Sequence, residues 1–193
     1  YIEFNGEAGS YGMSLGTSAS GTSANAYISS PGIILDGDGH VTKPRNPAFH
    51  VVKTSDQTDG VSTGHMTCSF QSEILDIGGN FASNTFTAPV DGIYYLHTHL
   101  DLRTVASTTY YIWPQIETAD RRFLGSLARI SDIANSQVDY YPIDCSAIAE
   151  MTAGDTAFVR VQSNNAGTAW VINGAAAGAD GVAYSYFEGY LLG

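Results

Sequence analysis

The chain has 193 residues, which fits one domain of ordinary size with or without a short appendage. Its 19 acidic side chains outnumber its 8 basic ones and give a formal net charge of −11 at pH 7. A protein that binds DNA or RNA needs Lys and Arg to displace counterions from phosphates, so this balance excludes nucleic acid and anionic membranes as expected partners. No apolar run reaches the length of a transmembrane helix, so we expect no membrane insertion.

The N-terminal part of the chain contains segments of small and polar residues. Asn5-Gly6 is a hairpin signal, and the run GTSASGTSAN at residues 16–25 has no side chains that could build a core. We therefore predict that residues 1–46 form a thin β-rich shaft or linker that packs against the head or against neighbouring chains. Two prolines within residues 44–47 fix the direction of the chain, so we place the domain boundary there and assign residues 47–193 to a head.

The phrase DGDGH at residues 36–40 places two acidic side chains in a glycine-rich corner. An EF-hand calcium loop needs oxygen ligands at alternating positions and a bidentate Glu at the twelfth, whereas here the fifth position is His40 and the twelfth is Pro47. Glycine supplies the positive φ of a tight corner, so we interpret the phrase as a turn. Asp56–Asp59 and Asp180-Gly181 are further acidic turns, but they lack the density of carboxylates that would specify calcium.

The head has the composition of an almost entirely β-structured domain. Gly, Tyr, Thr and Val are abundant, which suits strands and turns rather than helices. Short apolar or alternating runs separated by turn residues are typical of a sandwich or barrel. A single helical turn is expected at Ile130–Ser136. We predict ten strands, at residues 47–54, 64–70, 84–88, 92–104, 108–117, 122–130, 139–149, 156–163, 168–173 and 183–192.

Three motifs in the head resemble the globular head of complement C1q and its relatives, the trimeric jelly-roll family shared with tumour necrosis factor. The phrase FTAPVDGIYYL at residues 86–96 resembles the core strand of that family, and MTAGDTAFVRV at residues 151–161 resembles a later strand. The phrase YSYFEGYLL at residues 184–192 resembles the closing strand. The resemblance implies an all-β jelly-roll sandwich. Its core motif here consists of Phe86, Gly92, Tyr94, Phe187 and Gly189.

The alternation of side chains supports an oligomer independently of that resemblance. Along residues 92–100, one face of the strand carries Tyr94, Leu96 and Thr98, and the other carries Ile93 and Tyr95 with two histidines. The outer face of a monomeric sandwich should be mostly polar, so we predict that neighbouring subunits of a homotrimer cover part of it. The tyrosines predicted for the trimer interface are Tyr95, Tyr111, Tyr184 and Tyr186.

The region before the head resembles a different group of proteins. The phrase GDGHVTKPRNPAFHV at residues 37–51 is similar to linkers in tail-fibre and structural proteins of bacteriophages. Leu96 and Thr98 depart from the aromatic pattern of secreted animal members, and no Gly-X-Y collagen repeat precedes the head. The leading hypothesis is therefore a phage tail-fibre tip, located in the virion, that binds a host surface glycan or protein. The alternative is a secreted C1q-like lectin or signalling ligand. Because the sequence begins at Tyr1, we expect it to be the end of a longer protein.

Recognition is expected on loops of the rigid sandwich, with threefold presentation multiplying weak contacts. Trp113 and Trp170 are candidates because their amphipathic rings make platforms for sugars, and a place in the core is the alternative for both. Arg121 and Arg122 lie between two predicted strands and are candidates for contacting a receptor, with an ordinary solvated turn as the alternative.

His97 and His99 form the most distinctive polar pair. The two imidazoles share one face of a strand, and threefold symmetry would gather six of them around an axis. Fibre tips of some phages resemble this arrangement in holding iron through His-x-His pairs, so a transition metal on the axis is one hypothesis. The simpler interpretation is a pair of outer-face histidines hydrogen-bonded to polar neighbours. No other cofactor is expected, but calcium stays open as an alternative, because some relatives of the C1q head hold it at the apex of the trimer and the acidic surplus here would permit it.

Catalytic motifs are not evident. The Gly-x-Ser-x-Gly phrases at residues 12–16 and 60–64 do not stand between a predicted strand and a predicted helix, as a nucleophile elbow must. His65 and Cys68 lie close in sequence without an identifiable third residue to orient them. Cys68 and Cys145 are too few for a disulfide framework, and they either pair or remain as buried free thiols. We therefore expect a binding protein without enzymatic activity.

Overall fold

The computed structural model describes residues 26–28, 33–35, 40–58, 64–133, 139–164, 169–174 and 182–193. The chain divides into two compact units, Tyr1–Asn46 and Pro47–Gly193. The predicted corner at residues 36–39 lies outside the described residues. The described strands of the first unit form a small antiparallel sheet in the order β1 (Ala26–Ile28), β2 (Ile33–Leu35) and β3 (Val41–Thr42).

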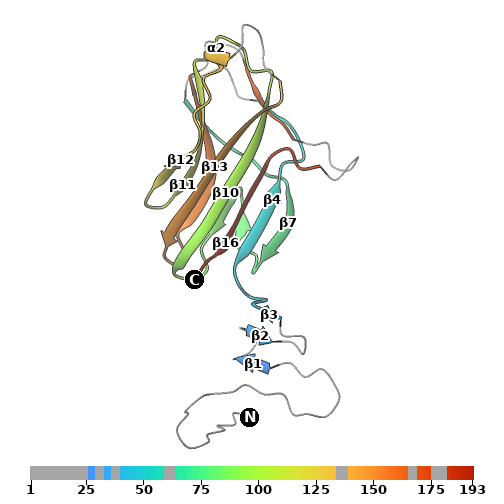
Figure 1. Cartoon of the computed structure of the whole chain (residues 1–193), viewed down its shortest axis with the longest axis vertical. Coiled ribbons are helices and arrows are strands. Elements are labelled where there is room, and N and C mark those ends of the chain that lie inside the picture. Colours follow the sequence, from blue (N-terminus) through green and yellow to red (C-terminus); the bar gives the residue numbers. More distant parts are fainter. Residues whose placement is uncertain are drawn as a thin grey trace, which may run out of the picture. The chain divides into compact units, whose positions relative to one another are not determined.

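The second unit is a sandwich of two antiparallel sheets (Figure 1). The seven-stranded sheet has the strand order β5 (Gln57–Thr58), β15 (Val171–Ile172), β10 (Gly92–Arg103), β16 (Tyr186–Leu191), β4 (Ala48–Val52), β7 (Ser72–Ile77). Its seventh strand, β13 (Tyr141–Met151), also pairs with β10. The six-stranded sheet has the strand order β12 (Arg122–Leu124), β11 (Tyr111–Thr118), β14 (Thr156–Asn164), β9 (Thr85–Thr87), β8 (Phe81–Ala82). Its sixth strand, β6 (Gly64–Thr67), also pairs with β14. One helical turn, α2 (Ile130–Ile133), follows β12.

This architecture confirms the predicted all-β jelly roll, and each of the ten predicted runs contains an observed strand. Three strands in the described part of the head were not predicted: β5, β7 and β8. The largest of them, β7, is an edge strand with Ile74 and Leu75 exposed and no regular alternation of buried side chains. Because an edge strand is only partly covered, its sequence lacks the two-residue period by which strands are recognised.

The core lies between the two sheets and is rich in aromatic rings. The ring of Phe49 stacks on Phe86 with centroids 4.6 Å apart and meets Phe187 edge-on at 4.9 Å. Gly189 passes beside this cluster, where an added Cβ would lie only 2.8 Å from Phe49 Cε1 and 2.7 Å from Leu96 Cδ2. Glycine is therefore required at this position because packing leaves no room for a side chain.

Both cysteines are buried free thiols, so the structure supports the second of the two alternatives considered for them. Burial raises the pKa of the Cys68 thiol to about 12, and it also raises the pKa of Cys145. These thiols keep their protons at neutral pH and serve as small apolar side chains. No helix among the described residues has the length and apolarity needed to cross a bilayer.

The two ends of the sandwich differ in what they carry. The first and last residues of the head lie at one end, where Leu191 N–H donates to Pro47 O and Ile93 N–H donates to Gly193 O, both at 2.9 Å. Strand β10 runs away from this end and finishes at Arg103. We call the Arg103 end the apex (Figure 1).

Candidate functional site

The outer surface of the seven-stranded sheet, which we call the seven-strand face, carries the alternating side chains of β10 that point away from the core. Tyr94, Leu96 and Thr98 are completely buried, whereas Tyr95 and His97 are partly exposed, as the alternation predicted. Pairing with neighbouring strands extends the face through Ile148 opposite Tyr95 on β13 and Tyr190 opposite Tyr95 on β16.

A cluster of histidines and carboxylates lies in the middle of this face. Glu188 bridges two of the imidazoles, with its Oε2 2.8 Å from His50 Nδ1 and its Oε1 3.2 Å from His97 Nδ1. A second carboxylate, Asp144 Oδ1, lies 2.6 Å from His99 Nδ1. The pairing of β4, β16, β10 and β13 brings these residues together from segments up to 138 positions apart.

Tyr186 lies within this cluster. Its ring stacks on His50 and on His99 with centroid distances of 5.4 Å in each case. Partial burial raises the pKa of its hydroxyl, and the nearby carboxylate of Glu188 adds to the shift. The predicted interface tyrosines Tyr95 and Tyr186 therefore share one face.

Apolar side chains border the polar cluster on the side nearer the start of β10. Ile93, Ile148 and Tyr190 are all exposed in the single chain, and Ile148 shows 65% of its surface. Scattered exposed apolar residues are common, but these three belong to three adjacent strands of one face. A contiguous surface of this kind is typical of a protein–protein interface.

The axial metal remains a prediction. His97 and His99 share the seven-strand face, and each has its Nδ1 beside a carboxylate. In the described part of the chain, no group of three or more His, Cys, Asp or Glu side chains is arranged to hold a metal ion. Of the calcium turns considered, Asp56 forms an ion pair with Arg103, and residues 59 and 180–181 lie outside the described residues.

The outer surface of the six-stranded sheet, which we call the six-strand face, carries several polar side chains bonded to one another, with Leu124 exposed at its edge strand. Glu117 accepts from Arg160 Nη1 at 2.5 Å and from Arg122 Nε at 3.3 Å. Trp113 is half-buried here and its Nε1–H donates to Gly125 O at 2.8 Å. The receptor candidates Trp113 and Arg122 thus lie on this face, already engaged by neighbours.

The remaining predicted site residues are dispersed. Tyr111 lies on the six-strand face, and Gln162 Nε2 donates to its hydroxyl at 3.3 Å. Arg121 lines an open depression of about 870 Å³ between the edge strands of the two sheets, beside Ile148 and Glu150. Tyr184 precedes β16 and lies at the apex. The four predicted interface tyrosines therefore do not share one face.

Trp170 requires a correction. It is a sequence candidate for a sugar platform with the core as the alternative, and the structure supports the core: its side chain is completely buried and its Nε1–H donates to Ser163 Oγ at 3.4 Å. It belongs to the core, where its ring contacts other apolar side chains rather than solvent. A surface receptor cannot reach it in this fold.

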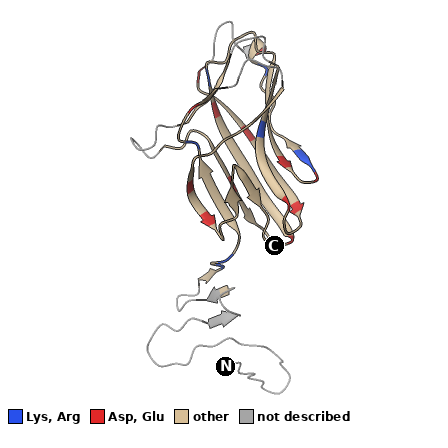
Figure 2. Cartoon of the chain, turned by 180° about the vertical axis from the view of Figure 1, so that it is seen from behind, with Lys and Arg blue, Asp and Glu red and all other residues tan. Residues whose placement is uncertain are grey.

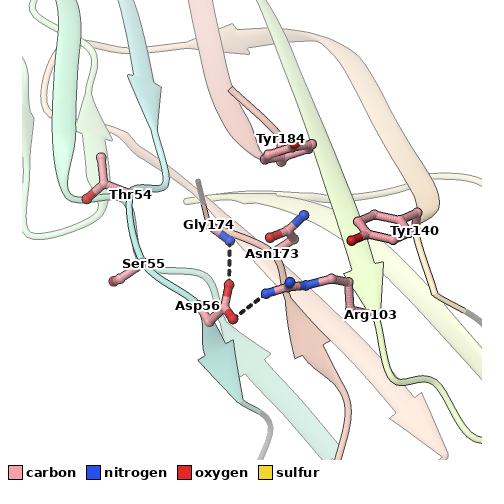
Figure 3. A pocket seen from close by; sticks show the side chains of 8 residues that line it. All are labelled: Thr54, Ser55, Asp56, Arg103, Tyr140, Asn173, Gly174 and Tyr184. Carbon is pink, nitrogen blue, oxygen red and sulfur yellow. Dashed lines mark hydrogen bonds and ion pairs between the residues drawn. The ribbon is translucent and has the colours of Figure 1, made fainter. Parts of the chain in front are cut away.

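The apex holds an open pocket of about 480 Å³ that the sequence did not predict (Figure 3). Asp56 connects three of the segments that line the pocket, since its carboxylate pairs with the Arg103 guanidinium and accepts from Gly174 N–H at 3.0 Å. Tyr140 and Tyr184 line it from two other segments, and Tyr140 adopts a left-handed backbone conformation with φ of 59°. Such conformations are costly for a large side chain and cluster at functional sites.

No local signal could have located this pocket from the sequence. Its lining comes from five separate segments that only the fold brings to one end. The adjacent Tyr140 and Tyr141 indicate at most that one ring is exposed, because successive side chains of an extended chain point to opposite sides, and they do not indicate a pocket. The lining residues are Thr54, Ser55, Asp56, Arg103, Tyr140, Asn173, Gly174 and Tyr184.

The structure gives no support to a Cys–His nucleophile. Cys68 is completely buried, with its pKa raised to about 12, whereas His65 is exposed. Partial desolvation and the nearby Arg160 guanidinium lower the pKa of His65. Basic side chains of the described residues are scattered over the head (Figure 2).

Comparisons with known proteins agree with this architecture. A family model of the C1q domain matches residues 48–192. The globular domain of zebrafish complement 1qA is similar in structure, with a TM-score of 0.52 and 15% identity over 77% of this chain and 98% of that chain. Murine APRIL at pH 8.0 is similar with a TM-score of 0.50 and 14% identity, covering 76% of this chain and 99% of that one. No curated protein matches the chain at a significant level.

Proposed function

The chain belongs to the C1q domain family, and from this premise we propose that it works as a homotrimeric, non-catalytic binding head of a virion fibre protein. Its task is to attach the particle to a glycan or protein on the host surface. Domains of this family form trimers and bind ligands, and they are generally not enzymes. The fibre context is supported by the resemblance of residues 37–51 to linkers of phage structural proteins.

The observation that carries the trimer is the seven-strand face. Ile93, Ile148 and Tyr190 leave apolar surface exposed on three adjacent strands. Covering that surface with a second and third copy removes it from water, which stabilises the assembly by roughly 25 cal/mol per Å² of apolar area. In a closed ring of three copies, the apolar surface of every copy is covered by its neighbours.

Trimerisation also supports adhesion. The apex is the end of the head away from Pro47, where the chain enters. Three parallel copies would present three apical surfaces in one direction, so individually weak contacts would combine into avidity. No chemical turnover is required for this function, because adhesion strength depends on the affinity of each site and on the geometry of presentation.

Family membership favours a second candidate, because proteins with this domain are often secreted. In that case the same trimeric head would serve a lectin or signalling ligand of a cellular organism. The gene sequence encoding the residues before Tyr1 separates the two, since a fibre shaft and a collagen stretch with a leader look nothing alike.

Sedimentation equilibrium of the chain at micromolar concentration tests the proposal, with a mass three times the 20.5 kDa of one chain as the expected result. Labelled trimer should then adsorb to host cells and compete with whole virions for attachment. A folded monomer at high concentration would overturn the trimer. Release of reducing ends from host polysaccharide would overturn the non-catalytic role.

A further inference from the structure

We propose that the apex pocket binds a neutral saccharide, a hexose unit held through its ring hydroxyls and its apolar C–H face. The inference rests on the proposed function, because it names the class of surface ligand that the head would recognise. It assigns this role to residues that differ from the tryptophans and arginines predicted from the sequence. The carrying observation is an exposed Arg103–Asp56 pair beside two exposed tyrosine rings.

The charges around the pocket argue against an anionic ligand. Arg103 is already paired with Asp56, and the ammonium of Lys53 is buried and donates to neighbouring oxygen atoms. Two more carboxylates belong to the surroundings of the pocket. Asp101 accepts from Asn173 Nδ2 at 2.7 Å, and Asp139 accepts from the backbone N–H of the residue that follows Arg103. These three acidic side chains outnumber the two basic ones, so a carboxylate, sulfate or phosphate would meet net repulsion.

The Arg103–Asp56 pair matches the hydroxyl groups of a sugar. Both side chains keep part of their surface exposed, 30% for Arg103 and 44% for Asp56. A sugar hydroxyl donates one hydrogen bond and accepts others, so one hydroxyl can donate to the carboxylate while its neighbour accepts from the guanidinium. Thr54 and Ser55 line the same pocket and add small polar side chains.

The two tyrosines supply the apolar side of the site. Tyr140 shows 65% of its surface and Tyr184 shows 40%, and Figure 3 shows both rings near Asn173, on the same side of the Arg103–Asp56 pair. Tyrosine offers a broad amphipathic surface with few rotatable bonds, so it orders on binding at low entropic cost. The C–H face of a hexose is the complementary surface for such a ring.

An open pocket of this kind should bind weakly in a single copy. Sites that bury most of a small ligand are deep and largely apolar, whereas this pocket is open and mixed in character. We therefore expect a dissociation constant on the order of millimolar for one hexose. The trimer compensates, because linked sites can raise overall affinity by about 10² to 10⁴.

The test uses the full chain with methyl glycosides of glucose, galactose and mannose as neutral probes and methyl glucuronide as the anionic probe. Saturation-transfer NMR and isothermal titration measure binding to a single site, so the readout does not depend on assembly. At least one neutral glycoside should bind, and methyl glucuronide should bind at least ~10-fold more weakly than the best neutral probe.

Matched variants assign the binding to the pocket. Tyr140→Asn removes the ring at a position whose left-handed backbone Asn tolerates, and it should weaken binding at least ~10-fold, whereas Tyr140→Phe should retain it. Asp56→Asn should weaken binding similarly. Asp120→Asn, which removes a carboxylate in the depression lined by Arg121, should leave it unchanged.

Two results would overturn the saccharide site: no neutral glycoside binds the wild-type chain, or binding survives both Tyr140→Asn and Asp56→Asn. Preferential binding of methyl glucuronide would overturn its neutral specificity. Sedimentation and cell-adsorption measurements on the same variants keep the two proposals apart. A trimer that adsorbs to cells equally well with or without Tyr140→Asn would refute this inference and leave the proposed function standing.

Discussion

The two outer faces of the sandwich use polar side chains in different ways. On the six-strand face, Glu117 bonds to Arg160 and Arg122, and Trp113 donates to the Gly125 carbonyl. The main polar contacts of this face are thus made within the single chain. The seven-strand face also contains a bonded cluster, but exposed apolar side chains border it on three strands.

This difference indicates which face meets water and which meets another copy of the chain. Arg–carboxylate pairs at a surface are stable in water and contribute little to association. Exposed isoleucines gain free energy only when something covers them. A histidine–carboxylate cluster in the same place is already paired, so covering it does not leave isolated charges buried.

The prediction with the largest expected effect comes from placing a positive charge on each of the two outer faces in turn. Ile148→Arg puts a guanidinium on β13 within the predicted interface, so we expect the trimer constant to fall by at least about 100-fold, since burying a charge without a matched partner costs several kcal/mol. Ile148 is 65% exposed in the single chain, so the folded monomer should tolerate the change. Sedimentation velocity over a concentration series measures the effect.

The matched control is Leu124→Arg on the six-strand face. Leu124 is also exposed, and it pairs with Gln115 in the register of β12 and β11. The trimer should survive this substitution unchanged. If Leu124→Arg dissociates the trimer and Ile148→Arg does not, the assignment of the two faces is reversed.

A smaller effect should appear when the ion pairs of the six-strand face are removed by Glu117→Gln. Partial burial opposes ionisation of Glu117, but the hydrogen bond and charge of Arg160 outweigh it and lower the pKa of the carboxyl. A lowered pKa stabilises the fold above the unfolded value of about 4.3 and loses that contribution as the pH falls through the folded value. We expect a loss of about 1 kcal/mol at pH 7.

The pH profile supplies the check on this second prediction. The difference in melting temperature between the wild type and Glu117→Gln should be largest at pH 6 to 7 and should shrink as the pH falls toward 3. Glu188→Gln on the seven-strand face serves as the comparison, because it should change the concentration dependence of melting, whereas Glu117→Gln should not. A gap that widened on acidification would contradict the sign of the effect.

The sequence predicts what depends on neighbours along the chain. Alternation in β10 correctly separated Tyr94 from Tyr95, because successive side chains of a strand point to opposite faces. The resemblance to the closing strand of the C1q family also identified the motif glycine Gly189, and packing against Phe49 explains why it is glycine.

Residues assembled from distant segments could not be predicted in the same way. Glu188 meets His50 across 138 positions, and the apex pocket needs five segments to fold before it exists. The surface interpretation of Trp170 is wrong, because an amphipathic ring does not by itself reveal on which side of the sheet it will point. Depth within a sandwich depends on register and on the second sheet, neither of which is encoded locally.

The mildest test concerns Trp113, and it addresses whether the six-strand face has any role in assembly. Trp113→Phe removes the hydrogen bond to Gly125 O while keeping an aromatic ring, so the folded state should lose about 1 kcal/mol and melt about 2–4 °C lower. The trimer constant should not change, because the lost contact lies within one subunit. Calorimetry and sedimentation on the same sample separate the two effects. A weaker trimer with an unchanged monomer would mean that this face also contacts a neighbour, and the distinction between the two faces would then fail.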